Sequence, residues 1–147
     1  MSESYIKKFL SVSVEVINSL SNSQISKVIE IVSFVKQSKG RIFFAGSGGG
    51  AGHSSHAAAD FRNLLGIESY SITDNVSAIT ALVNDDCWEN SYKEWLKTSN
   101  INSHDCLFVM SVGGGDQKLH ISENLVRAIE HTKSVGGKVV GIVGRDG

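Results

Sequence analysis

The sequence has no proline and only two cysteines among its 147 residues, and its formal net charge is −1. The cysteines, Cys87 and Cys106, form no C-x-x-C pattern, so we expect buried thiols in a reducing compartment. Without a basic cluster, the chain lacks the electrostatic signature of a general nucleic-acid binder. No apolar run approaches the roughly 20 residues of a membrane span, and the first residues contain no signal-peptide core. We therefore expect a cytoplasmic protein that binds neither nucleic acid nor membrane.

The composition is that of an ordinary globular protein, with 41% hydrophobic and 20% charged residues. A chain of this length can bury a core of its own, so we expect a single domain over residues 1–147. Because proline is absent, the fifteen glycines alone mark the special backbone positions.

The N-terminal segment, residues 1–40, predicts two helices. Apolar residues recur with a 3.6-residue period over residues 6–20 and again over residues 25–35. Ser21 or Ser23, in the polar break between them, would cap the second helix. The apolar surface of these two helices is larger than a small sheet needs to cover it. We therefore expect this segment to pack within a homo-oligomer.

Four apolar runs then alternate with helix-like segments. Trp88, Tyr92 and Trp95 also recur at helical spacing, which indicates packing against a neighbouring helix or subunit. Unbroken Val, Ile, Phe and Leu runs in such alternation are typical of a parallel sheet buried on both faces. The predicted fold class is therefore α/β, a three-layer sandwich around a parallel sheet, preceded by the N-terminal helices. The expected strands are residues 41–46, 69–73, 106–112 and 138–144, and the expected helices between them are about 52–65, 76–84 and 122–135.

A glycine loop, Gly46–Gly52, follows the first expected strand and leads directly into a helix that carries His53, His56 and Asp60. Glycine lets a ligand approach the backbone, and a helix N-terminus attracts an anion. The spacings of three and four residues place both histidines and the carboxylate on one helical face. Such a face can bind a metal ion, transfer protons with Asp60 as the base, or remain a solvated surface.

The same loop also satisfies a relaxed dinucleotide-binding fingerprint, G-x-G-x-x-A, through Gly46, Gly48 and Ala51. Asp74, near the end of the second strand, would then bind a ribose. The long helical segment before the first strand and the histidines at the helix turn disfavour this interpretation. We therefore expect neither a nicotinamide nor a flavin cofactor.

A second glycine loop, Gly113–Gly115, follows the third expected strand, so both loops lie at strand carboxyl ends, where open α/β sheets bind ligands. Ser111 offers a hydroxyl at the end of that strand. Ser122 is expected to cap the next helix, and its hydroxyl and the neighbouring N–H groups could also bind a phosphate. Asn84 and Asp85 form a polar pair at the end of another expected helix, which turn chemistry alone would also explain.

In their order and spacing, these motifs resemble the sugar isomerase (SIS) domain, and within it the phosphoheptose isomerases, over nearly the whole chain. The family's first loop reads roughly GNGGS-x5-H-x3-E. The family histidine and glutamate fall on His56 and Asp60, while Ser47 replaces the asparagine and Gly50 the serine. The loop positions that match are Gly46, Gly48 and Gly49.

Two further family motifs are present in altered form. The substrate-lining N-D pair of the family falls on Asn84 and Asp85. In the family's phosphate loop, S-T-S-G-N-S-x-N, Val112 and Gly113 replace hydroxyl residues, and an insertion follows. The positions of that loop that match are Ser111, Gly114, Ser122 and Asn124.

The resemblance implies a flavodoxin-like SIS fold and a homotetramer built through the N-terminal helices. It also implies interconversion of sedoheptulose 7-phosphate and D-glycero-D-manno-heptose 7-phosphate, with Asp60 and His56 as catalytic residues and as candidate ligands of a zinc ion. The substrate-binding residues that it implies are Ser47, Gly48, Gly49, Asn84, Asp85, Ser111, Gly113 and Ser122. In the family, a later segment supplies a glutamine and a histidine of the site, and we expect that segment to be absent from this chain.

Three departures from the family favour an alternative function, and one of them is the expected absence of that later segment. Asp60 is one methylene shorter than the family glutamate, and the second loop has lost hydroxyl residues. A SIS module that binds a sugar phosphate or a protein without catalysis therefore remains a second hypothesis.

Overall fold

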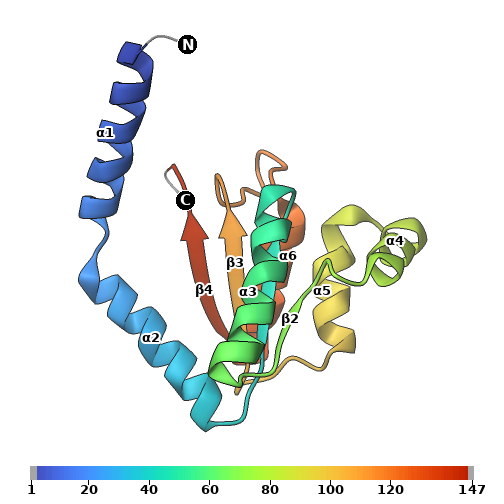
Figure 1. Ribbon diagram of the computed structural model, residues 1–147. Coiled ribbons are helices and arrows are strands. Elements are labelled where there is room, and N and C mark those ends of the chain that lie inside the picture. The colour runs from blue at the N-terminus through green and yellow to red at the C-terminus, as the bar shows by residue number, and fades with distance from the viewer. Residues whose placement is uncertain (1–2, 146–147) are drawn as a thin grey trace. The chain divides into compact units, whose positions relative to one another are not determined.

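The computed structural model describes residues 3–145 (Figure 1). The chain divides into two compact units, one that ends at Glu30 and one that begins at Ile31. The first unit contains helix α1 (Glu3–Ser19) and most of helix α2 (Asn22–Gln37). The second unit contains the end of α2 and all four strands.

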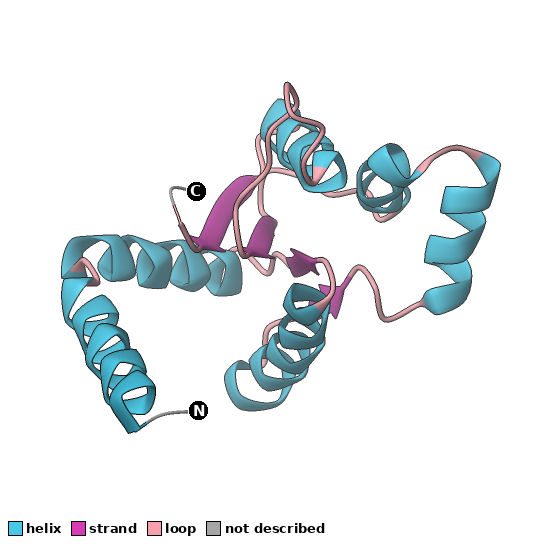
Figure 2. Ribbon diagram, turned by 90° about the horizontal axis from the view of Figure 1, so that it is seen from above, coloured by secondary structure: helices cyan, strands magenta, loops and turns pink. Residues whose placement is uncertain are grey.

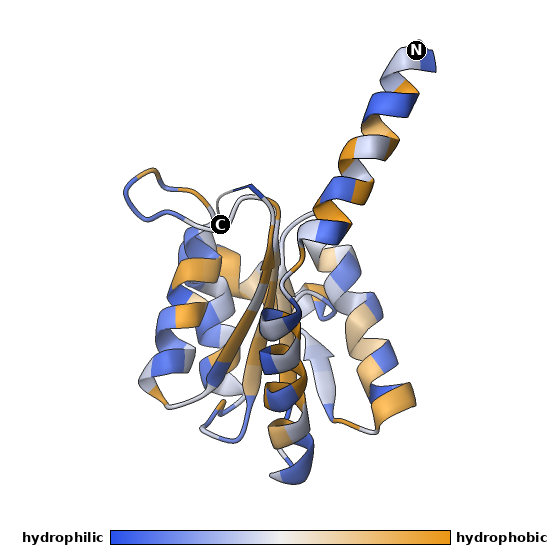
Figure 3. Ribbon diagram, turned by 90° about the vertical axis from the view of Figure 1, so that its left-hand side faces the viewer, coloured by the Kyte–Doolittle hydropathy of each residue, from blue (hydrophilic) through white to orange (hydrophobic). Residues whose placement is uncertain are grey.

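Helices α1 and α2 confirm the two helices expected at the N-terminal end. Ser21 caps α2 by accepting a hydrogen bond from the backbone N–H of Gln24 at 3.4 Å. Apolar and polar residues alternate along α1 (Figure 3), and none of its described residues is buried. The apolar side chains that α1 leaves exposed include Ile6, Phe9, Leu10 and Ile17.

The second unit is built on a four-stranded sheet in the order β2-β1-β3-β4, with every pair parallel. This confirms the α/β fold class with its parallel, flavodoxin-like order, in which the first strand lies between the second and the third. The strand bounds are Ile42–Gly46 for β1, Ser69–Ser71 for β2, Cys106–Ser111 for β3 and Lys138–Val143 for β4. Strand β2 is two residues shorter than expected.

Helices cover both faces of this sheet, which makes three layers (Figure 2). Successive strand residues point to opposite faces. Phe43 contacts the ring of Trp95 on one face, whereas Phe44 contacts Phe61 on the other. The helices of the second unit are α3 (Gly49–Leu65), α4 (Val76–Asp85), α5 (Trp88–Thr98) and α6 (Glu123–Ser134).

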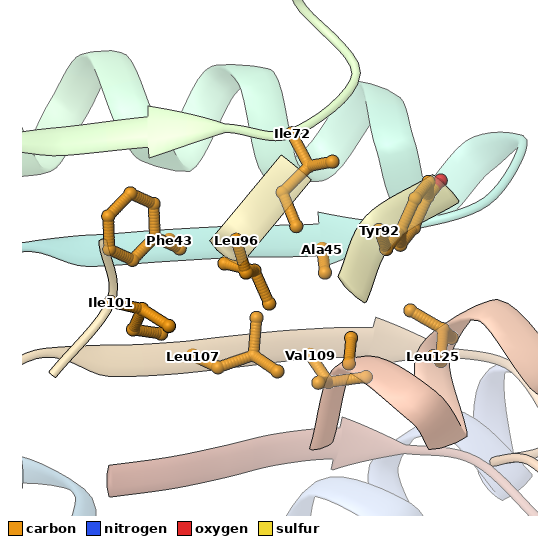
Figure 4. Packing of buried hydrophobic residues seen from close by; sticks show 10 residues of the cluster. Phe43, Ala45, Ile72, Tyr92, Leu96, Ile101, Leu107, Val109 and Leu125 are labelled. Atoms are coloured by element: carbon orange, nitrogen blue, oxygen red, sulfur yellow. The ribbon is translucent and has the colours of Figure 1, made fainter. Parts of the chain in front are cut away.

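The core lies mainly between the sheet and the pair α5 and α6 (Figure 4). Tyr92 and Leu96 of α5 and Leu125 of α6 are buried against Leu107 and other residues of the strands. The burial of each such large side chain stabilises the fold by roughly 1.5–3 kcal/mol. Of the three aromatic residues expected to pack on a neighbouring helix or subunit, Tyr92 is buried in this core, Trp95 contacts Phe43 and Tyr70 of the strands, and Trp88 remains 41% exposed.

Helix α3 begins three residues earlier than expected, so most of the first glycine loop is helical. Gly48 adopts a left-handed φ of 55° at the N-cap, a conformation that glycine reaches without strain. The N–H groups of Ala51 and Gly52 then donate to the Gly48 carbonyl at 3.1 and 3.3 Å.

The two cysteines differ in their environments. Cys106 is buried in β3, and this burial raises the pKa of its thiol to about 12. Cys87 precedes α5 and is only partly buried. The expectation of buried thiols is therefore correct for Cys106 and wrong for Cys87, whose helix-start position leaves it near solvent.

None of the helices described within residues 3–145 combines the length and the apolar character needed to cross a bilayer.

The helix caps of α4 and α6 provide a matched test of stability. The Asn75 side chain accepts a hydrogen bond from the Ala78 N–H at 3.0 Å, so Asn75→Ala should lower the free energy of unfolding by about 1 kcal/mol. Ser122 also occupies an N-cap, but its left-handed backbone, with φ at 48°, prevents the side-chain capping bond that the sequence predicted. Ser122→Ala should therefore change stability by less than about 0.5 kcal/mol. Urea unfolding measures both, and equal losses would contradict this assignment.

Candidate active site

The carboxyl ends of β1 and β3 form the edge of the sheet at which both glycine loops begin (Figure 1). At this edge Gly46 and Gly50 lie close to Met110 of β3. A Cβ atom on Gly46 would come within 2.8 Å of the Met110 carbonyl oxygen, and one on Gly50 within 2.5 Å. Side chains at these positions would push the loop off the sheet. The glycines therefore bring the start of α3 close to the strand ends, where its N–H groups and dipole favour an anion.

His56 and Asp60 lie at ion-pair distance on α3, with 3.4 Å between His56 Nε2 and Asp60 Oδ2. The His56 side chain is 82% exposed and that of Asp60 50% exposed, so both remain open to a ligand or to another protein surface. An imidazole beside a carboxylate can exchange protons with a bound molecule.

His53 does not join this pair. It lines a separate hollow of about 470 Å³ together with Gly49, Gly50 and Ser111. Within residues 3–145 no three His, Cys, Asp or Glu side chains converge as metal ligands. His53 is thus turned toward the strand ends, away from the His56–Asp60 pair, and a metal ion on this helical face stays a prediction.

The His56–Asp60 pair could supply part of a zinc site. A zinc ion lies about 2 Å from each nitrogen or oxygen ligand, so two atoms 3.4 Å apart can share one ion. A catalytic zinc normally has three protein ligands. The pair thus fits two positions of such a site, and the described residues contain no group of three.

Beneath the first loop lies a buried polar network. The Tyr92 hydroxyl donates to the Gly46 carbonyl at 2.7 Å, and burial raises the pKa of Tyr92 while the Ser47 hydroxyl opposes that shift. The fully buried Asn124 places its side-chain nitrogen 3.5 Å from Ser47 Oγ. Asn124 Oδ1 is the one buried side-chain polar atom without a hydrogen-bond partner among the described residues. The network joins the start of α6 and helix α5 to the first loop.

The second loop is ordered by its own contacts. Ser111 Oγ donates to the Gly114 carbonyl at 3.1 Å, so its hydroxyl is engaged within the loop. The Ser122 hydroxyl makes no capping bond at the start of α6 and is available for another partner. A Cβ on Gly113 would lie 3.6 Å from a guanidinium nitrogen of Arg145, so this cation lies beside the loop.

The Asn84–Asp85 pair lies apart from these groups. Both residues belong to the last turn of α4, where the Asn84 side chain donates to Asp85 Oδ1 at 2.9 Å. Both are exposed, and no hydrogen bond described within residues 3–145 joins them to either glycine loop. Asp74 accepts a hydrogen bond from Ser55 of α3.

Three residues at this edge carry contacts that the sequence did not predict. Tyr92 was expected only to pack, Asn124 was noted only as a match to the family's phosphate loop, and Arg145 was not named. The partners of these three residues lie 46, 77 and 32 positions away in the chain, so no local pattern predicts the contacts themselves.

The fold defines an open α/β sheet protein, with a candidate site at the carboxyl ends of its parallel strands. The profile of the family described as "SIS domain" matches residues 4–144. The chain therefore belongs to the SIS domain family.

Several relatives and solved structures carry the name phosphoheptose isomerase. The chain is 27% identical over 146 residues to the one from Helicobacter pylori strain P12, covering 96% of this chain and 70% of the relative. It is 27% identical over 129 residues to that of Clostridium acetobutylicum, covering 84% of this chain and 62% of the relative. The solved structure of a phosphoheptose isomerase from Francisella tularensis superposes with a TM-score of 0.85 at 20% identity, covering 100% of this chain and 77% of that one. The chain thus spans between 62% and 77% of the length of these proteins.

Proposed function

We propose that this chain is an aldose–ketose isomerase that interconverts sedoheptulose 7-phosphate and D-glycero-D-manno-heptose 7-phosphate. Membership of the SIS family and the names of its relatives support the sugar-phosphate class. The observation that carries the proposal is the His56–Asp60 pair, 3.4 Å apart on the helix that follows the glycine loop. This arrangement provides an anion-binding edge and a proton-transfer pair on one short segment.

In the proposed reaction, Asp60 removes a proton from the carbon next to the sugar carbonyl. The electrons of the broken C–H bond form an enediolate with its negative charge on the former carbonyl oxygen, and this oxygen takes up the proton of the adjacent hydroxyl group. The protonated Asp60 then returns its proton to the former carbonyl carbon, which leaves the new carbonyl on the neighbouring carbon. His56 orients the Asp60 carboxylate. Because both side chains are at least half exposed, a bound sugar or a second subunit would have to exclude water from the pair.

The second loop and the start of α3 would bind the phosphate. The donors that support this role are the Ser122 hydroxyl, which makes no capping bond, the N–H groups at the helix starts and the Arg145 cation. Ser47, Gly48 and the neighbouring glycines would hold the substrate against the sheet edge. Binding of this remote group supplies orientation for the reacting carbons.

A zinc ion is proposed at His56 and Asp60, with its remaining ligands from outside the described residues. When bound, zinc would polarise the substrate carbonyl.

We further propose a homotetramer in which the N-terminal helices form subunit contacts. The exposed apolar side chains of α1, such as Phe9 and Ile17, support this role. Light scattering should give a tetramer for the parent chain and smaller species for Phe9→Lys/Ile17→Lys, because buried ammonium groups are costly. The exposed Lys8→Glu serves as the charge control. A folded monomer of the parent chain would contradict this role.

The second candidate is a non-catalytic module that binds a sugar phosphate. The Ser111 hydroxyl, engaged with the Gly114 carbonyl, favours it because fewer loop donors remain for a substrate. Proton NMR of sedoheptulose 7-phosphate with the chain separates the two functions. New aldose signals support the isomerase, whereas thermal stabilisation by the sugar without conversion supports the binding module.

A further inference from the structure

A hollow of about 410 Å³ lies between α5, α6 and the loop that joins β3 to α6. It is distinct from the candidate active site, because α3 with His56 and Asp60 covers the opposite face of the sheet. The side chains that line it include Asn90, Lys93, Gln117, Arg127, Glu130 and His131.

Two cations in this hollow share one neutral acceptor. Lys93 Nζ donates to Asn90 Oδ1 at 3.0 Å, and an Arg127 guanidinium nitrogen donates to the same oxygen at 2.7 Å. The Lys93 and Arg127 side chains are only 30% and 34% exposed, so water screens their repulsion incompletely. An anion placed between them would turn this repulsion into two favourable contacts.

The three acids around the hollow balance Lys93, Lys97 and Arg127, so its net charge becomes positive when His120 and His131 are protonated. Glu94 is shared by Lys93 at 3.3 Å and Lys97 at 2.9 Å. Glu123 is likewise shared by Arg127 and His120, and hydrogen bonding to His120 lowers the pKa of Glu123. The carboxylate that lines the hollow itself is Glu130, and Gln117 already donates to it at 2.9 Å.

His131 adds a titratable donor to the same wall. Burial, followed by Lys97 and Lys93 of α5, lowers the pKa of His131, while Glu94 acts in the opposite direction. Arg127 and Glu130 are the other charged residues of α6 that line the hollow beside His131. A bound anion would favour the charged imidazole and raise its pKa.

We propose that this hollow binds the phosphate group of a small anionic metabolite, held by Arg127, Lys93 and protonated His131. A planar guanidinium beside an ammonium and an imidazolium supplies the charge-assisted donors that a tetrahedral oxyanion accepts. Gln117 belongs to the loop between β3 and α6, so a ligand here would contact the segment that also carries Ser122 of the candidate active site.

Inorganic sulfate is the first probe, because its charge is constant over the pH range in which His131 titrates. The His131 imidazole signal in NMR reports on this hollow alone, whatever binds at the glycine loops. Added sulfate should shift that signal saturably, raise the His131 pKa and bind more tightly as the pH falls. Inorganic phosphate should do the same. Sodium chloride at equal ionic strength is the salt control.

Two variants with equal loss of charge test the assignment. Lys93→Met should weaken sulfate binding by about tenfold, the size expected for loss of one charge-assisted contact. Lys133→Met, on an exposed position of α6 outside the hollow, should change it less than twofold. If Lys93→Met alters the fold, Arg127→Gln provides the second test. A His131 signal unmoved by sulfate, or equal weakening by Lys93→Met and Lys133→Met, would overturn the proposal. Neither result depends on isomerase activity.

Discussion

Asp60→Asn is expected to lower the turnover of sedoheptulose 7-phosphate by about 10²–10⁴-fold while the fold is retained. The amide keeps the shape of the carboxylate and its place 3.4 Å from His56, but it cannot accept the substrate proton. The expected loss therefore falls on kcat rather than on KM. A steady-state assay with purified wild-type and variant chains measures both constants.

Glu68→Gln is the matched control for this loss. Glu68 is exposed before β2, and its carboxylate accepts a hydrogen bond from Tyr70, which a glutamine oxygen can also accept. This variant should keep wild-type turnover. Full activity of Asp60→Asn would assign the base to another residue, and His53, which lines the hollow beside Ser111, would be the next to replace.

The second large effect is expected at the opposite end of the strands. Asp105→Asn should lower the free energy of unfolding by about 3–5 kcal/mol, because it leaves a partly buried arginine without its counter-charge. The Asp105 side chain is 1% exposed and lies 2.7 Å from the Arg41 guanidinium, and it also accepts the Arg41 backbone N–H at 2.8 Å. This carboxylate raises the pKa of Arg41. The pair joins the residue before β1 to the residue before β3.

Urea unfolding followed by circular dichroism measures this loss. Glu3→Gln breaks an ion pair of similar length, 2.7 Å to Lys7, whose side chains are 82% and 74% exposed. It should change stability by less than about 1 kcal/mol, as is usual for surface pairs. If Asp105→Asn cost no more than Glu3→Gln, the Arg41–Asp105 pair would not be important for stability.

Strands β1, β3 and β4 could be predicted from the sequence because each contains an apolar run between breaks, whereas β2 has a serine at each end and is shorter than expected. Their parallel pairing follows from the alternation with helices, which leaves no hairpin connection. The early start of α3 could not be predicted, because glycine has low intrinsic helix propensity. There the carbonyls of Ser47 and Gly48 accept the N–H groups of the first turn and outweigh that propensity.

In the candidate site, only contacts between residues close together in the sequence could be predicted. The His56–Asp60 contact follows from helical spacing, whereas the position of His53 depends on how α3 lies against β3. The contact of Tyr92 with Gly46 depends in the same way on the packing of α5. For Ser122 the sequence correctly predicted the N-cap position, but the left-handed backbone prevents the capping hydrogen bond that was expected there.

The central claim is that this chain transfers a proton next to a sugar carbonyl. Proton NMR of sedoheptulose 7-phosphate in D₂O, with and without zinc, tests it most directly. We expect deuterium to appear on the carbon beside the carbonyl with the wild-type chain and far more slowly with Asp60→Asn. Absence of exchange by a folded chain that the sugar still stabilises against heat would contradict the isomerase and leave a sugar-phosphate-binding module.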